Sequence, residues 1–299
     1  MSADIPPAAV DAAEIARLEE IARRIRVEVV RAVNIARAGH LGGPLSAADM
    51  LAALYFRILR IRPDEPDWPD RDRFVLSKGH ASIGLYAAMA LRGYFPLEEL
   101  ATFDAANSRL QGHPDMTRLP GLDMSSGSLG MGISAAMGMA LGARLTRRDV
   151  RAYVMLGDGE CQEGEVWEAA MAASRYGLDN LIAIVDHNKL QQYGWPGNGP
   201  DGRMPPQAPG ELVAKWSAFG WRVLEVDGHT MEDVVDVLEE AGHGDGRPTV
   251  VISHTVKGKG VSFMEGHYFW HTRAIKPDEF AIAMADLGEP IPATNGGGR

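Results

Sequence analysis

The residues best suited to chemistry begin with an aspartate between two glycines. Asp158 follows the apolar run YVMLG, which is typical of a buried strand, and Gly159 comes directly after it. Glycine lets a ligand approach the backbone closely, and the free N–H groups of a following helix attract anions. Because a carboxylate repels a phosphate unless a metal lies between them, the motif indicates a hard cation such as Mg²⁺.

A second oxygen ligand follows the next predicted strand, LIAIVD. Asn188 lies just beyond that strand, with 28 residues between Gly159 and Asn188. One strand-helix-strand unit would bring the Asp158 carboxylate and the Asn188 amide oxygen together at adjacent strand ends. Each motif alone is most often a turn. At this spacing, the two together predict a metal-bridged diphosphate.

The elements that position these residues alternate between helices and short apolar strands. We expect helices at 11–38, 46–59, 82–92, 97–103, 131–145, 164–174, 211–218 and 230–241, with Ser46 as the N-cap of the second. We expect strands at 74–76, 152–156, 181–186, 221–226 and 248–253, and irregular chain at 39–44, 107–130 and 187–210. This alternation predicts an α/β fold whose parallel sheet has helices on both faces.

Composition bounds the domain organisation and excludes some partners. The chain has 299 residues, 45% of them hydrophobic, and we expect one domain over 11–287 between disordered residues 1–10 and 288–299. A net charge of −10 without basic runs argues against nucleic acid as a partner. The apolar stretches are shorter than the about 20 residues of a membrane span, and no signal pattern is present, so we expect no membrane partner and a cytoplasmic location.

The single cysteine, Cys161, cannot form an internal disulfide, which agrees with a reducing compartment. We interpret it as a small buried side chain. A reactive thiol is the alternative, because a helix N-terminus lowers the pKa of a nearby thiol.

Several separate stretches together resemble the N-terminal, thiamine diphosphate-binding part of transketolases. The resemblance covers about residues 12–285 and rests on GHLGGP (39–44), DRFVLSKGH (72–80), QGHPD (111–115), SSGSLGMG (125–132), GDGECQEGEVWEA (157–169), DHNKLQQYG (186–194) and TVKGKGVSFME…WH (255–271). It implies thiamine diphosphate and Mg²⁺ as cofactors, with Ca²⁺ or Mn²⁺ as possible substitutes for the metal.

The resemblance also implies which residues form the site. The metal ligands would be Asp158, Asn188 and the main-chain carbonyl of Leu190. The cofactor would be contacted by His80, His113, Gly127, Ser128, Leu129, Gly159, Asn188, Gln192, Lys257 and His271. His40 and His271 would bind substrate, and catalysis would involve these two with His113 and Glu163. His267 is the alternative to His271, because Thr272 follows His271 where the family commonly has glycine.

Four histidines from four segments suit a ketose substrate, since imidazole can donate to or accept from hydroxyl and carbonyl oxygens near pH 7. Taken singly, His40 could cap the first helix and His80 could be a core group. We expect the remaining histidines to be structural or solvent-facing: His187, His229, His243, His254 and His267. We expect Glu160 and Glu165 only to favour the positive end of a helix.

The activity that the resemblance implies is transfer of a two-carbon ketol unit from a ketose phosphate to an aldose phosphate, as in the pentose phosphate pathway. In the family, the glutamate that helps to activate the cofactor lies in the following domain. This chain would therefore need a partner, a C-terminal transketolase subunit, in a heterotetramer with two copies of each. One alternative is the α-subunit of a 2-oxo acid dehydrogenase, which the SKGH, GHP and WH segments disfavour. The other is a non-catalytic cofactor-binding module, which the four histidines disfavour.

Overall fold

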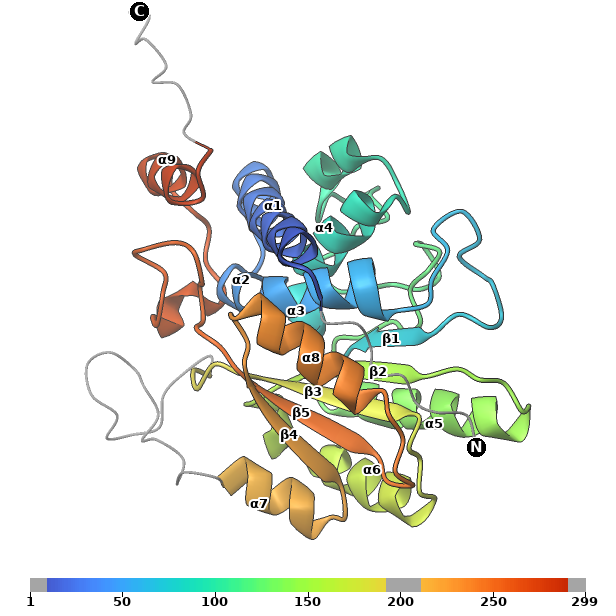
Figure 1. Ribbon diagram of the computed structural model, residues 1–299. Coiled ribbons are helices and arrows are strands. Elements are labelled where there is room, and N and C mark those ends of the chain that lie inside the picture. Colours follow the sequence, from blue (N-terminus) through green and yellow to red (C-terminus); the bar gives the residue numbers. More distant parts are fainter. Residues whose placement is uncertain (1–9, 192–210, 290–299) are drawn as a thin grey trace, which may run out of the picture.

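The central sheet is parallel throughout. The computed structural model describes residues 10–191 and 211–289, and within them the strands run in the order β1-β2-β3-β5-β4 (Figure 1). Their bounds are β1 Arg73–Leu76, β2 Ala152–Gly157, β3 Leu181–His187, β4 Arg222–Asp227 and β5 Thr249–His254. Each lies within one residue of the predicted strand at both ends. The predicted parallel α/β fold is confirmed.

Helices cover both faces of the sheet (Figure 1). One layer contains α1 (Ala12–Ala36), α3 (Ala48–Ala53), α4 (Ser82–Arg92) and α8 (Met231–Ala241). The opposite layer contains α5 (Met131–Leu145), α6 (Gly164–Arg175) and α7 (Glu211–Ala218). The short α2 (Gly42–Ser46) and α9 (Pro277–Asp286) lie beside α1. In the described part of the chain, no helix has the length and apolar character needed to cross a membrane.

The strands are apolar without alternation because both of their faces are covered. In β2, Tyr153 and Met155 belong to the core beneath the α1 layer, whereas Val154 and Leu156 belong to the core beneath α5 and α6. Each fully buried aliphatic side chain contributes roughly 1.5–3 kcal/mol. The two cores hold the strand ends in place on both sides.

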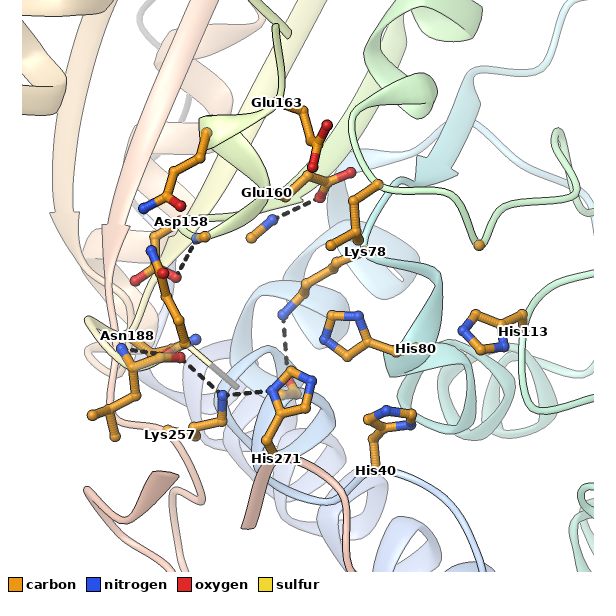
Figure 2. A pocket seen from close by; sticks show the side chains of 18 residues that line it. His40, Lys78, His80, His113, Asp158, Glu160, Glu163, Asn188, Lys257 and His271 are labelled. Carbon is orange, nitrogen blue, oxygen red and sulfur yellow. Dashed lines mark hydrogen bonds between the residues drawn. The ribbon is translucent and has the colours of Figure 1, made fainter. Parts of the chain in front are cut away.

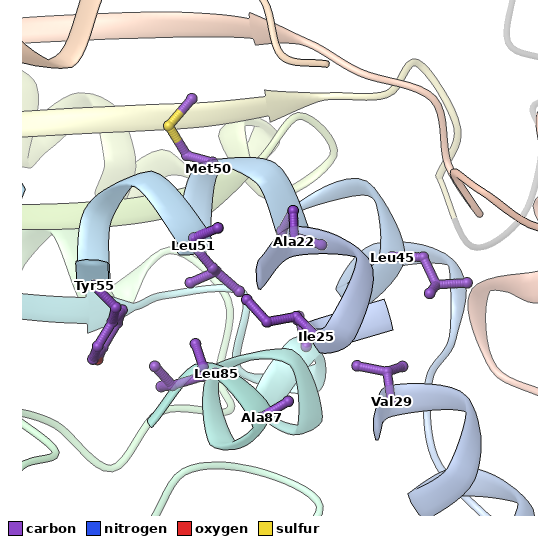
Figure 3. Packing of buried hydrophobic residues seen from close by; sticks show 14 of the residues in the cluster. Ala22, Ile25, Val29, Leu45, Met50, Leu51, Tyr55, Leu85 and Ala87 are labelled. Atoms are coloured by element: carbon purple, nitrogen blue, oxygen red, sulfur yellow. The ribbon is translucent and has the colours of Figure 1, made fainter. Parts of the chain in front are cut away.

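The first helix supplies much of the larger core. The Asp11 side chain caps α1 by accepting a hydrogen bond from the Glu14 backbone N–H at 2.7 Å. Farther along the helix, Ile25 and Val29 are fully buried, and Ile25 points towards Leu51 of α3 and Leu85 of α4 (Figure 3). The amphipathic pattern predicted this helix, but burial extends beyond the one apolar face, since Val27 and Val30 are buried as well.

Two details of the N-terminal segment were predicted wrongly. Ser46 is not an N-cap but the last residue of α2, and its buried hydroxyl donates to Asp186 Oδ2 at 2.7 Å. Part of the predicted loop 39–44 is helical, because α2 begins at Gly42. The local preference of serine for an N-cap position was misleading here, because the Ser46 hydroxyl bonds instead to a residue distant in the sequence. The second helix continues after α3 as a π-helical turn, Leu54–Ile58, and predicted helix 97–103 is a 3₁₀ helix, Leu97–Thr102.

The remaining structural predictions concern Cys161 and the chain ends. Cys161 is 4% exposed, and burial raises the pKa of its thiol well above the usual value, so the interpretation as a small buried side chain is confirmed. The ends predicted to be disordered, 1–10 and 288–299, lie outside the described residues except for Val10, Gly288 and Glu289. Segment 107–130 contains turns without a helix or strand, as predicted.

Candidate active site

A cavity of about 670 Å³ opens at the carboxyl ends of the strands (Figure 2). Ligands commonly bind at this edge of a parallel α/β sheet, where the loops meet. The lining residues come from segments distant in the sequence: His40, Gly43, Lys78, His80, His113, Gly127, Leu129, Gly157, Asp158, Gly159, Glu160, Gln162, Glu163, Asn188, Leu190, Gln191, Lys257 and His271.

Asp158 is a buried carboxylate at the end of β2. Gly157 pairs with Asp186 in the sheet, so the residues after β2 and β3 emerge side by side. Asp158 is 7% exposed, and its two oxygens accept hydrogen bonds from the Gly159 N–H at 2.7 Å and the Lys189 N–H at 2.6 Å. Burial, together with the charge of Asp186, raises the pKa of Asp158 to about 6. A cation in the cavity would relieve this burial cost.

The oxygens near Asp158 fit a hard cation. Asn188 Oδ1 accepts a hydrogen bond from the Leu190 N–H at 3.1 Å, and the Leu190 carbonyl accepts one from Lys257 Nζ at 2.9 Å. Each of these oxygens retains a further lone pair. Among residues 10–191 and 211–289, no cluster of three or more His, Cys, Asp or Glu could hold a metal. A cation here would therefore use one carboxylate, amide and carbonyl oxygens, and phosphates of a ligand, which is the pattern that Mg²⁺ prefers.

Lys78 and Asp186 form a buried ion pair behind these ligands, and neither was predicted as a site residue. Both side chains are at most 3% exposed. Although burial opposes ionisation, the charge of Lys78 holds the pKa of Asp186 below its usual value. Asp186 Oδ2 also accepts from Asn188 Nδ2 at 3.3 Å, which turns the amide oxygen of Asn188 away from Asp186. For Asp186, the available signal in the sequence was a single charged residue at the carboxyl end of an apolar strand.

The prediction that Glu160 only favours the positive end of a helix is wrong. It is 2% exposed and accepts hydrogen bonds from Ser77 Oγ, from the Gly130 N–H at 2.8 Å and from the Gly157 N–H at 2.9 Å. These donors lie at the ends of β1 and β2 and at the start of α5. Glu160 thus fastens the segment before α5, which includes Gly127, to the sheet. The prediction was wrong because two of the donors are far from Glu160 in the sequence.

Four histidines converge on the other side of the cavity (Figure 2). The ring centroids lie 5.0 Å apart for His40 and His80, 4.8 Å for His80 and His271, and 6.3 Å for His40 and His113. Burial, followed by the charges of neighbouring groups, lowers the pKa of His40 to about 4 and that of His271 to about 3. Burial lowers the pKa of His80 as well. At neutral pH these three rings are uncharged hydrogen-bonding groups.

The geometry distinguishes between the two histidines near the C-terminal end of the domain. His271 lines the cavity, and its Nδ1 lies 3.0 Å from Lys257 Nζ. His267 is exposed and is not among the lining residues. Burial lowers the pKa of Lys257 to about 8. Lys257 therefore connects the Leu190 carbonyl with the histidine side of the cavity.

The remaining predicted site residues lie at the rim. Gly127 and Leu129 line the cavity, whereas Ser128 is exposed and does not. Glu163 lines the mouth at the start of α6, with its side chain exposed. At Gly159, an added Cβ would lie 3.0 Å from the Gln191 side chain, so the backbone there is closely approached. Gln192 lies outside the described residues.

Known proteins similar to this chain are transketolases and their subunits. The family model for the transketolase thiamine diphosphate binding domain matches residues 18–292. The chain is 44% identical to the 6-deoxy-6-sulfo-D-fructose transketolase subunit of Clostridium sp. (strain MSTE9), covering 89% of this chain and 94% of that protein. It is 40% identical to an apulose-4-phosphate transketolase subunit of Phocaeicola vulgatus, covering 93% of this chain and 96% of that protein.

Solved structures agree with these matches. The transketolase of Campylobacter jejuni superimposes with a TM-score of 0.83 at 31% identity, covering 93% of this chain and 43% of that chain. The transketolase of Leishmania mexicana gives a TM-score of 0.83 at 31% identity, covering 91% of this chain and 41% of that chain. The chain thus spans less than half the length of these solved proteins. From the family match and the shared fold, the chain belongs to the transketolase family and corresponds to its thiamine diphosphate-binding domain.

Proposed function

We propose that this chain is the cofactor-binding subunit of a split transketolase-type enzyme, which transfers a two-carbon ketol unit between a ketose and an aldose. The observation that carries the proposal is one cavity with two kinds of lining: oxygen ligands at the ends of β2 and β3, and neutral histidines opposite them. Relatives named as transketolase subunits have similar lengths, since the matches cover 94% and 96% of them.

Thiamine diphosphate and Mg²⁺ are the proposed cofactors. Asp158, Asn188 and the Leu190 carbonyl would hold the metal, for which Ca²⁺ or Mn²⁺ could substitute. Backbone groups at Gly159 and along 127–129 would contact the diphosphate, with Lys257 and Gln192 as further cofactor contacts. The bound cofactor supplies the carbanion chemistry, and the protein binds it and orients it.

The histidines are proposed to handle the sugar. His40 and His271 would bind its hydroxyl and carbonyl oxygens and move protons at them, because a neutral imidazole can both donate and accept. His113, exposed at the rim, would contact both cofactor and substrate, and His80 would contact the cofactor. The relatives named for 6-deoxy-6-sulfo-D-fructose and apulose-4-phosphate make a ketose with an anionic end the proposed donor class, of which a pentose pathway sugar phosphate is one case.

A C-terminal transketolase subunit is the proposed partner. It would supply the acid that helps to activate the cofactor, and Glu163 at the cavity mouth would communicate with it across the interface. The proposed assembly is a heterotetramer in the cytoplasm, in which residues 11–287 of this chain form the folded unit.

Reconstitution tests this function. The purified chain is assayed for ketol transfer with several ketose phosphates, alone and with the C-terminal subunit, in the presence of thiamine diphosphate and Mg²⁺. We expect activity only in the mixture. Full activity of the isolated chain would contradict the split enzyme, and release of CO₂ from a 2-oxo acid would indicate the dehydrogenase class instead. Cofactor binding without turnover in any mixture would indicate a non-catalytic module.

A further inference from the structure

A chain of buried hydrogen bonds runs from α1 to the loop after β5. Arg26 is 8% exposed and pairs with Asp49 of α3, whose Oδ1 lies 3.0 Å from Arg26 Nη1. Asp49 Oδ2 lies 2.7 Å from Nδ1 of His229, which follows β4 and whose side chain is 11% exposed. On the far side of the ring, His229 Nε2 accepts the backbone N–H of Val256 at 2.8 Å. None of these residues lines the cavity.

The two partners determine the tautomer of His229. A backbone N–H can only donate, so His229 Nε2 carries no proton. The proton therefore lies on Nδ1, which donates it to the Asp49 carboxylate. His229 is thus a neutral ring held between an acceptor and a donor, and only the donor, Val256, belongs to a segment that reaches the cavity.

Val256 lies between two residues that contact the candidate site. Thr255 Oγ1 donates to Asp186, the residue that orients Asn188. Lys257 Nζ reaches the Leu190 carbonyl at 2.9 Å and His271 Nδ1 at 3.0 Å. The position of the Val256 amide therefore affects both the oxygen ligands and the histidine side of the cavity.

We propose that His229 is a positioning residue for the cofactor site, and that its Nε2 holds the segment 255–257 in the conformation that lets Lys257 span the cavity. The proposal rests on the proposed function, because it assigns the segment to cofactor binding. Its effect passes through Val256, whereas the bond between His229 and Asp49 serves the stability of the fold.

Two substitutions separate these bonds. His229→Asn places an amide nitrogen near the position of Nδ1, so it retains the donor to Asp49 and loses the acceptor for Val256. His229→Gln places an amide oxygen near the position of Nε2, so it retains the acceptor and loses the donor to Asp49. Hydrogen bonds to a charged group contribute more to stability than neutral ones. A purely structural role therefore predicts greater damage from His229→Gln in every measurement.

If His229 positions the segment, the variant that is worse in cofactor binding should be the better one in stability. We expect His229→Asn to weaken Mg²⁺-dependent thiamine diphosphate binding about tenfold, as for one lost hydrogen bond, and His229→Gln to change it little. We expect the lower unfolding temperature in His229→Gln. Titration calorimetry on the full chain measures cofactor binding, and thermal unfolding measures stability. His243→Asn is the control, because His243 is exposed.

Hydrogen exchange at the Val256 amide provides a readout that needs no cofactor. We expect faster exchange in His229→Asn and near-native protection in His229→Gln. Equal exchange in the two variants, or weaker binding in His229→Gln than in His229→Asn, would overturn the positioning role. A wild-type chain that binds no thiamine diphosphate would contradict the proposed function instead, while the exchange comparison would still decide whether His229 holds Val256.

Discussion

The two sides of the cavity differ in charge and in the way they are built. The oxygen side consists of Asp158, Asn188 and Leu190 at the ends of two neighbouring strands, backed by the buried pair of Lys78 and Asp186. The histidine side consists of rings from four separate segments, which meet without a hydrogen bond between the rings in the described structure (Figure 2). One side is ionic and braced by the sheet, and the other carries the uncharged rings of His40, His80 and His271 on loops and short helices.

On the proposed function, this difference should separate cofactor binding from turnover. A diphosphate and its metal need fixed charges, which the sheet can hold at constant spacing. Sugar hydroxyls need groups that donate and accept without carrying charge, and burial keeps the rings of His40, His80 and His271 neutral for that task. Changes on the oxygen side should therefore affect cofactor affinity, and changes on the histidine side should affect turnover.

The largest effect is expected from Asp158→Ala. Removing the only carboxylate of the proposed metal site should weaken Mg²⁺-dependent thiamine diphosphate binding by more than about 100-fold, because even outer groups of metal sites are worth about 10–100-fold. Titration calorimetry measures this change. Glu165→Gln, in the first turn of α6, is the control and should bind normally. Binding by Asp158→Ala with near-native affinity would exclude the aspartate as a metal ligand.

Asp186→Asn should destabilise the fold by about 3–5 kcal/mol, the range for leaving one member of a buried ion pair unpaired. The uncompensated charge would be Lys78, which is 2% exposed. Urea unfolding followed by circular dichroism measures the loss. A change smaller than about 1 kcal/mol, by the same scale, would mean that the pair is not a brace of the oxygen side.

His40→Ala should lower turnover about 100-fold, at the lower end of the range for general acid-base groups. Its cofactor affinity should remain native, since the ring lies on the histidine side. Steady-state kinetics of the complex with the partner, together with cofactor titration of the chain, test the two statements. Loss of cofactor binding equal to that of Asp158→Ala would refute the separation of the two sides.

A smaller effect is expected from pH. The folded-state pKa of His40, about 4, lies below the value of about 6.5 for a free histidine. Below pH 6.5 the unfolded chain therefore takes up a proton that the folded chain excludes, and stability falls with falling pH. We expect His40→Asn to reduce this loss between pH 7 and pH 5 in urea unfolding measurements. A steeper loss in the variant would contradict a neutral, partly buried His40 ring.

The smallest effect is expected from His267→Asn. This ring is exposed outside the cavity, so both turnover and cofactor affinity should stay within about twofold of the native values, as for most surface substitutions. His271→Asn is the comparison and should lower turnover. If the two variants gave the opposite result, the active-site histidine would be His267.

Sequence patterns predicted the metal-binding residues of the oxygen side better than the residues that hold this side in place. Asp158 and Asn188 could be placed together because adjacent parallel strands bring their carboxyl ends to one edge. The roles of Glu160 and Ser46 could not be predicted, since each depends on partners brought close only by the complete fold. The histidines could be assigned to one site only through the family resemblance. They lie in loop segments, and the sequence of a loop has no periodicity that shows where its side chains lie.

The most direct test of the separation is the coupling between Mg²⁺ and thiamine diphosphate in three proteins: wild type, Asp158→Ala and His40→Ala. Cofactor affinity is measured by calorimetry at increasing Mg²⁺ concentration. We predict that affinity rises with Mg²⁺ in the wild type and equally in His40→Ala, and that it does not respond to Mg²⁺ in Asp158→Ala. An unchanged Mg²⁺ response in Asp158→Ala, or a lost response in His40→Ala, would contradict the account.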